Sequence, residues 1–85
     1  MAQILYFSTP TCGPCKMFKP VVQEVSAQLG VGITYVDATV DPNRALQFSV
    51  SVVPTIIIES GGSVLYRHSG VMSKSQLTQV LSQFR

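Results

Sequence analysis

Short apolar runs alternate along this chain with segments whose apolar residues have helical spacing. This alternation predicts a small fold that contains both strands and helices. The run QILYF at residues 3–7 ends at Ser-Thr-Pro and predicts a buried strand. Apolar positions in helical spacing then predict a helix from Gly13 or Pro14 to Leu29. Gly30 is its expected stop. We expect the apolar positions of this helix to line one side, namely Met17, Phe18, Val21, Val22, Val25 and Leu29.

Two prolines fall within the predicted first helix and have different consequences. Pro14 suits the first turn, where its missing N–H costs no hydrogen bond. Pro20 lies in the interior, where we expect it to kink the helix near Lys16.

A second strand and a short helix follow. The segment ITYVDA, residues 33–38, predicts the strand. The segment DPNRALQFS, residues 41–49, predicts a short helix with Asp41 as its N-cap and Pro42 in its first position. We expect Phe48 to anchor this helix.

The last third of the chain predicts a hairpin and a final helix. The segments VVPTIIIE (52–59) and SVLYRH (63–68) predict two strands, joined by a Ser-Gly-Gly turn. Ser73 and Gln76 form a capping box that starts the last helix. We expect Met72 and Leu77 to form a hydrophobic staple at this start. The buried stripe of the helix is expected to comprise Leu77, Val80, Leu81 and Phe84.

The order of elements defines the fold class as α/β. A helical crossover joins the first two strands, so these should be parallel, whereas the last two form an antiparallel hairpin. We therefore predict one four-stranded mixed sheet with helices on both faces. The length of 85 residues favours a single domain, residues 1–85.

Composition narrows the class of protein further. The chain is 46% apolar and only 12% charged, which excludes a charge-rich disordered segment. Its net charge is +2 and its basic residues are scattered, so we expect no nucleic-acid partner. No apolar run approaches the ~20 residues of a membrane span, and the N-terminus lacks the basic region of a signal peptide. We expect a soluble cytoplasmic protein, in which a close cysteine pair is more often catalytic or metal-binding than structural.

Cys12 and Cys15 are the only cysteines of the chain. Cys12 is expected at the N-terminus of the first helix, where the dipole and the free N–H groups favour a thiolate. Lys16 adds positive charge one turn on, and Cys15 should be more buried. An exposed attacking thiol beside a resolving thiol suits thiol–disulfide exchange.

A zinc site and a structural disulfide are the alternatives. Zinc usually takes four nitrogen or sulfur ligands, and this chain offers two cysteines and His68. A site within one chain is therefore disfavoured, while a site shared between two chains stays open. A structural disulfide would close too short a loop to constrain the unfolded chain much. The residues thus favour a redox pair.

Several motifs occur in an order that matches one known family. They are CGPCK, the helix proline Pro20, VVPT at residues 52–55, the SGG turn, and GVMSKSQL from Gly70. On these motifs, which cover nearly the whole chain, the sequence resembles the thioredoxin family, for which C-x-x-C near a βαβ unit is a known signature. The resemblance implies the thioredoxin fold and thiol–disulfide oxidoreductase activity.

The resemblance also implies roles for individual residues. Cys12 would be the nucleophile and Cys15 the resolving thiol. Pro54 would form a cis peptide bond opposite the active site, although only about 5–6% of X–Pro bonds are cis in general. Val53 would offer its backbone to an extended substrate chain, and Gly70 would leave room for it. The implied substrate-binding residues are Thr11, Gly13, Pro14, Val53, Pro54 and Gly70.

Four features depart from the family pattern. The chain starts directly at the strand before the motif, without the family's usual first strand and helix. Thr11 replaces the tryptophan that normally precedes the first cysteine. Tyr6 occupies the place of the buried acid beneath the second cysteine, and Asp37 occupies the place of the lysine that usually partners this acid.

The last two departures raise the question of which group deprotonates Cys15. Tyr6 can hydrogen-bond but is a poor base near neutral pH. Asp37 is expected at the carboxyl end of the second strand, on the same sheet edge as Cys12, where ligands of such sheets usually bind. We predict that Asp37 assists Cys15 as a nearby base. The alternative is a solvated aspartate that caps the following loop.

Three functions are compatible with these features of the sequence. The leading one is a small thioredoxin-like reductase of protein disulfides, acting as a monomer without a bound cofactor or metal. It would draw electrons from NADPH through a flavin-containing thioredoxin reductase. The second is a glutaredoxin reduced by glutathione; the missing tryptophan fits it, but the Gly-Pro pair and the placement of Gly61-Gly62 argue against it. The third is a thioredoxin-like binding subunit of a larger enzyme, whose activity would survive Cys12→Ser.

Overall fold

The computed structural model describes residues 2–84, and its elements follow the order predicted from the sequence. They are β1 (Gln3–Ser8), α1 (Gly13–Leu29), β2 (Ile33–Asp37), α2 (Pro42–Gln47), β3 (Thr55–Ser60), β4 (Ser63–Ser69) and α3 (Lys74–Ser82). Within the described residues, no helix combines the length and the apolar character that a bilayer crossing requires.

The four strands form one mixed sheet in the order β2-β1-β3-β4. Strands β1 and β2 are parallel, as the crossover through α1 predicts, and β3 is antiparallel to both β1 and β4. At the end of the parallel pair, Ser8 lies beside Asp37. The predicted four-stranded sheet with three helices is confirmed.

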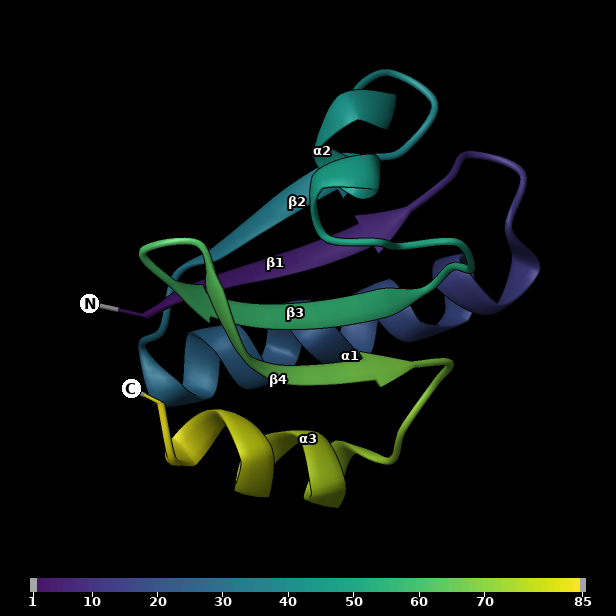
Figure 1. Ribbon diagram of the computed structural model, residues 1–85. Coiled ribbons are helices and arrows are strands. Elements are labelled where there is room, and N and C mark those ends of the chain that lie inside the picture. Colours follow the sequence, from purple (N-terminus) through teal and green to yellow (C-terminus); the bar gives the residue numbers. More distant parts are fainter. Residues whose placement is uncertain (1, 85) are drawn as a thin grey trace.

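Each face of the sheet carries its own apolar core, because successive residues of a strand point to opposite sides. Helices α1 and α3 cover one face, where Tyr6 and Ile56 pack with Phe18 and Leu77. Helix α2 covers the other face, where Phe7 packs with Phe48 at a ring-centroid distance of 6.3 Å. Figure 1 shows the sheet between these two layers. The predictions of helices on both faces and of Phe48 as an anchor are confirmed.

Two expectations from the sequence are wrong, and the first concerns Met17. Met17 is 79% exposed, whereas the buried positions of α1 are Cys15, Phe18, Val22 and Val25. These four lie on one side of a helix that advances 100° per residue, and Met17 points away from them.

The second expectation concerns the start of β3. We expected it to begin near residue 52, but it begins at Thr55. Pro54 has no N–H to donate to a sheet, so residues 52–54 form a loop instead. Helix α1 is continuous through Pro20, and the kink there stays a prediction.

The helix starts have the predicted side-chain caps. In the capping box of α3, Ser73 Oγ accepts the Gln76 N–H at 3.1 Å and Gln76 Oε1 accepts the Ser73 N–H at 3.2 Å. Asp41 Oδ1 accepts the Arg44 N–H at 3.2 Å at the start of α2. Each bond satisfies a donor that has no partner inside its helix.

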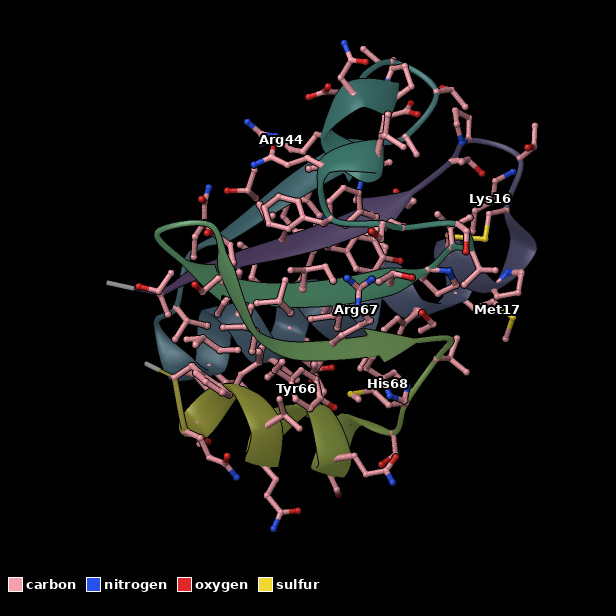
Figure 2. The ribbon with its side chains drawn as sticks, viewed as in Figure 1. Lys16, Met17, Arg44, Tyr66, Arg67 and His68 are labelled. Atoms are coloured by element: carbon pink, nitrogen blue, oxygen red, sulfur yellow. A yellow bond between two sulfur atoms is a disulfide. The ribbon has the colours of Figure 1, made fainter. Side chains whose placement is uncertain are left out.

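The end of α2 was not foreseen. The Val50 N–H bonds the Ala45 carbonyl and the Ser49 N–H bonds the Leu46 carbonyl, which is a Schellman motif. This motif places Ser49 in the left-handed region, at φ 56°. The guanidinium of Arg67 on β4 donates to the Phe48 and Ser49 carbonyl oxygens and ties this turn to the sheet (Figure 2).

We expect Ser49→Gly to raise the free energy of unfolding by about 0.5–1 kcal/mol. The left-handed conformation costs an L residue about 1–2 kcal/mol, whereas the extra chain entropy of glycine costs about 0.5–1 kcal/mol. Urea denaturation of the two proteins measures the difference. The matched control is Ser51→Gly, because Ser51 is exposed and has no positive φ. The control should lose about 0.5–1 kcal/mol, and equal losses in both variants would contradict the prediction.

Candidate active site

Cys12 begins helix α1 as its N-cap residue. Its backbone is extended, at φ −83° and ψ 110°, and its Sγ accepts the Cys15 N–H at 3.1 Å. Gly13 and Pro14 form the first helical positions, and the missing N–H of Pro14 costs no helical hydrogen bond there. The free N–H groups and the dipole of the helix therefore act on this sulfur, and both favour its thiolate.

Cys12 and Cys15 form a disulfide, with their Cα atoms 5.2 Å apart. Figure 2 shows it as the yellow bond at the start of α1, close to the labelled Lys16. Cys15 is only 3% exposed, whereas Cys12 is partly exposed. Cys15 is therefore the more buried cysteine of the pair, as the sequence predicted.

The loop before β3 lies against the first cysteine. The Val53–Pro54 peptide bond is cis, which confirms the prediction for Pro54. Cys12 Sγ lies 3.8 Å from the Val53 carbonyl oxygen. The Pro54 carbonyl in turn accepts the Gly70 N–H at 2.8 Å, so three segments distant in sequence meet at one end of the sheet. This end lies at the right of Figure 1.

Gly70 has a backbone reason to be glycine. Its φ is 96°, a conformation that L residues rarely adopt. A Cβ at this position would meet no atom of the protein within 4 Å. The space beside Gly70 is thus open, and its use by a substrate stays a prediction.

Sequence reasoning missed two residues that hold this loop. Thr55 is 1% exposed, and its Oγ1 donates to the Val52 carbonyl at 2.7 Å. The same oxygen lies 3.1 Å from Ser69 Oγ on β4. The one signal in the sequence is a hydroxyl side chain at the start of the otherwise apolar run TIII.

Tyr6 lies beneath Cys15 on the central strand β1. Its side chain is fully buried, and its hydroxyl donates to the Cys15 carbonyl oxygen at 3.1 Å. Burial, and to a smaller extent the neighbouring Tyr35, raises the pKa of Tyr6 to about 12. The hydroxyl therefore keeps its proton at neutral pH and cannot accept one from Cys15.

Asp37 lies where its position in β2 predicted, at the same edge as the cysteines. Asp37 and Cys15 line one cleft of about 300 Å³ between α1 and the ends of β1 and β2. The Asp37 carboxylate accepts the Thr39 N–H at 2.8 Å and the Thr39 hydroxyl at 2.5 Å. These bonds, the hydroxyl first, lower the pKa of Asp37. The carboxylate thus caps the following loop, and its assistance to Cys15 stays a prediction.

The other predicted substrate-binding residues surround Cys12 on the surface. Thr11, Gly13 and Pro14 are all exposed. Within residues 2–84, no group of three or more His, Cys, Asp and Glu side chains is arranged to hold a metal ion.

The fold and the site together define a class of protein. A mixed sheet carries a disulfide at a helix N-terminus, with the first cysteine partly exposed, the second buried and a cis-proline loop opposite. This arrangement is that of a thioredoxin-fold thiol–disulfide oxidoreductase, whose chemistry resides in the cysteine pair itself.

Comparisons with known proteins identify the family. The thioredoxin family model matches residues 1–83. The chain is 35% identical to thioredoxin of Haemophilus influenzae over 82 residues, covering 94% of this chain and 77% of that protein. It is 37% identical to thioredoxin of Chlamydia trachomatis, covering 94% and 79%. The structure of thioredoxin 1 from Thermosipho africanus superposes with a TM-score of 0.83 at 26% identity, covering 96% and 92%. The chain belongs to the thioredoxin family.

We expect Tyr6→Phe to destabilise the protein by about 1 kcal/mol, because a buried carbonyl loses its hydrogen bond. The rate at which Cys15 resolves a mixed disulfide should stay within about twofold, because a neutral hydroxyl supplies no base. Urea denaturation and a stopped-flow assay of resolution measure the two effects. Tyr35→Phe is the control, since the Tyr35 side chain makes no hydrogen bond within residues 2–84 and the residue is 40% exposed. A large loss of resolution rate in Tyr6→Phe alone would contradict the prediction.

Proposed function

We propose that this protein reduces disulfides of other proteins through a mixed disulfide on Cys12. The Cys12 thiolate attacks one sulfur of the substrate disulfide, and the other substrate sulfur leaves as a thiolate. Cys15 then loses its proton and attacks Cys12, which forms the Cys12–Cys15 disulfide and releases the reduced substrate. The substrate gains two electrons and the cysteine pair loses two.

One observation carries this proposal. Cys12 is partly exposed, and its sulfur lies at a helix N-terminus and 3.8 Å from the Val53 carbonyl oxygen, beside cis-Pro54. An extended substrate chain can align its backbone with Val53 while its own sulfur meets Cys12. Thr11, Gly13, Pro14 and Gly70 form the surface around this position.

The partners of the family indicate the source of electrons. We propose that a flavin-containing thioredoxin reductase returns the cysteine pair to the dithiol with NADPH, and that the protein binds no cofactor of its own. A reducing compartment such as the cytoplasm suits this cycle, because thiols are kept reduced there. A monomer suits it as well, because the proposed substrate surface surrounds Cys12 of one chain.

We expect the protein to reduce insulin disulfides when NADPH and thioredoxin reductase are present, which the turbidity of reduced insulin measures. Cys12→Ser should lose this activity completely. Cys15→Ser should instead accumulate the mixed disulfide on Cys12, because nothing resolves it; mass spectrometry detects this species. A parallel assay contains NADPH, glutathione reductase and glutathione. Faster reduction in that assay would replace the reductase partner by glutathione, and full biological activity of Cys12→Ser would indicate a binding subunit.

Asp37 has a separate test. We propose that its carboxylate receives the Cys15 proton through the cleft that both residues line. Asp37→Asn should then slow resolution of the mixed disulfide by at least about threefold near pH 6–7, below the ~10²–10⁴-fold effect of a directly bonded base. Rapid quenching of the mixed disulfide from pH 6 to 9 measures this. Asp41→Asn is the control, since that carboxylate pairs with Arg44. An unchanged rate over the whole pH range would exclude the role.

A further inference from the structure

The resolving step poses an electrostatic problem in this protein. Cys15 must become a thiolate although it is 3% exposed, and burial disfavours a charged form. Beneath it lies the neutral hydroxyl of Tyr6, which donates to the Cys15 backbone carbonyl and not to its sulfur. Among the groups described so far, Lys16 alone carries a charge that favours the thiolate of Cys15, and the carboxylate of Asp37 disfavours it.

Lys19 brings a positive charge to the cleft beside Cys15. It lies one turn after Cys15 on α1, and side chains four residues apart project from the same side of a helix. Both residues line the cleft of about 300 Å³. The Lys19 ammonium lies 5.5 Å from the ring centroid of Tyr35, which stands on the opposite wall. This cation–π contact holds the ammonium across the cleft.

The charges around Cys15 add up to a positive cleft. Lys16 and Lys19 on α1 and Asp37 on β2 line it, while Tyr6 and Tyr35, the other titratable side chains facing Cys15 from the strands, are neutral at pH 7. Among residues 2–84, Lys74 pairs with Glu24 and Arg44 pairs with Asp41, whereas neither cleft lysine is in an ion pair. The Asp37 carboxylate accepts hydrogen bonds from the backbone N–H and the hydroxyl of Thr39.

We propose that Lys19 is a charge-stabilising residue for the resolving thiol, whose ammonium favours the Cys15 thiolate through the cleft. The inference depends on the proposed role of Cys15 as the resolving cysteine. In the step itself, the Cys15 proton goes to water or to the Asp37 carboxylate. The bond from Cys15 to Cys12 forms as the bond from Cys12 to the substrate breaks, and the substrate sulfur leaves with the electron pair. Lys19 acts through its charge and exchanges no proton in this step.

The test titrates Cys15 alone. In a Cys12→Ser background Cys15 is the only cysteine, and serine is a favoured N-cap residue, so the helix start is kept. Thiolate absorbance measured against pH gives the midpoint, which is the pH at which half of the Cys15 side chains are thiolates. Lys19→Met should raise this midpoint by about 0.5–1 pH unit, less than the ~1–3 units of a close buried pair, because Lys19 is exposed and screened by salt. Lys19→Arg should restore the midpoint, because it keeps the charge.

Two controls separate charge from structure. Lys74→Met removes one positive charge outside the cleft and should leave the midpoint unchanged. Asp37→Asn should leave or lower the midpoint, because removal of a negative charge cannot disfavour a thiolate. High salt should shrink the difference between the parent and Lys19→Met.

The rate at which the mixed disulfide is resolved is then measured in proteins that retain Cys12. Lys19→Met should slow resolution of the mixed disulfide about 3–10-fold at pH 7 and approach the parent rate above both midpoints, since one pH unit is a tenfold change in thiolate ratio. The proposal is overturned if Lys19→Met titrates like the parent, if Lys19→Arg shifts as far as Lys19→Met, or if Lys74→Met or Asp37→Asn raises the midpoint equally. The insulin assay of the parent tests the reductase function separately, because the titration gives its result whatever that activity is.

Discussion

The packing of helix α1 on the central strand β1 determines where each part of the active site lies. Tyr6 occupies the middle of that contact: its ring packs against Phe18 and its hydroxyl binds the Cys15 carbonyl. The first turn of α1 is thereby held at a fixed height above the sheet. Cys12 then faces the cis-proline loop that precedes β3, and Cys15 faces the cleft beside β2.

The same contact changes the electrostatics of the site. A tyrosine in the centre of the sheet adds packing and one hydrogen bond, but no charge at neutral pH. The charged residues that line the cleft are Lys16 and Lys19, which are exposed, and Asp37, which is partly exposed. Charges at such positions act more weakly than buried ones and respond to salt. In the proposed mechanism, the helix N-terminus favours the thiolate of Cys12, whereas the lysines of the cleft favour the thiolate of Cys15.

Much of the fold was predictable because its signals are local. The capping box at Ser73, the N-cap at Asp41 and the Gly-Gly hairpin turn are short patterns whose geometry depends on neighbouring residues alone. Met17 shows the limit of such patterns, since helical spacing names the apolar positions but not which of them meets the sheet. The Thr55–Ser69 pair and the bond from Arg67 to Phe48 were missed because the partners lie in different segments of the chain.

The sequence by itself determined the chemistry, since a cysteine pair two residues apart at a helix start can reach its disulfide within one turn. It also determined the family, through motifs that keep their order along the chain. Only the tertiary structure decided which groups act on each sulfur. Val53 is brought to Cys12 from 41 residues away, and Tyr35 and Asp37 are brought to Cys15 from the neighbouring strand. Such contacts depend on strand order and register, which arise from the packing of the whole sheet.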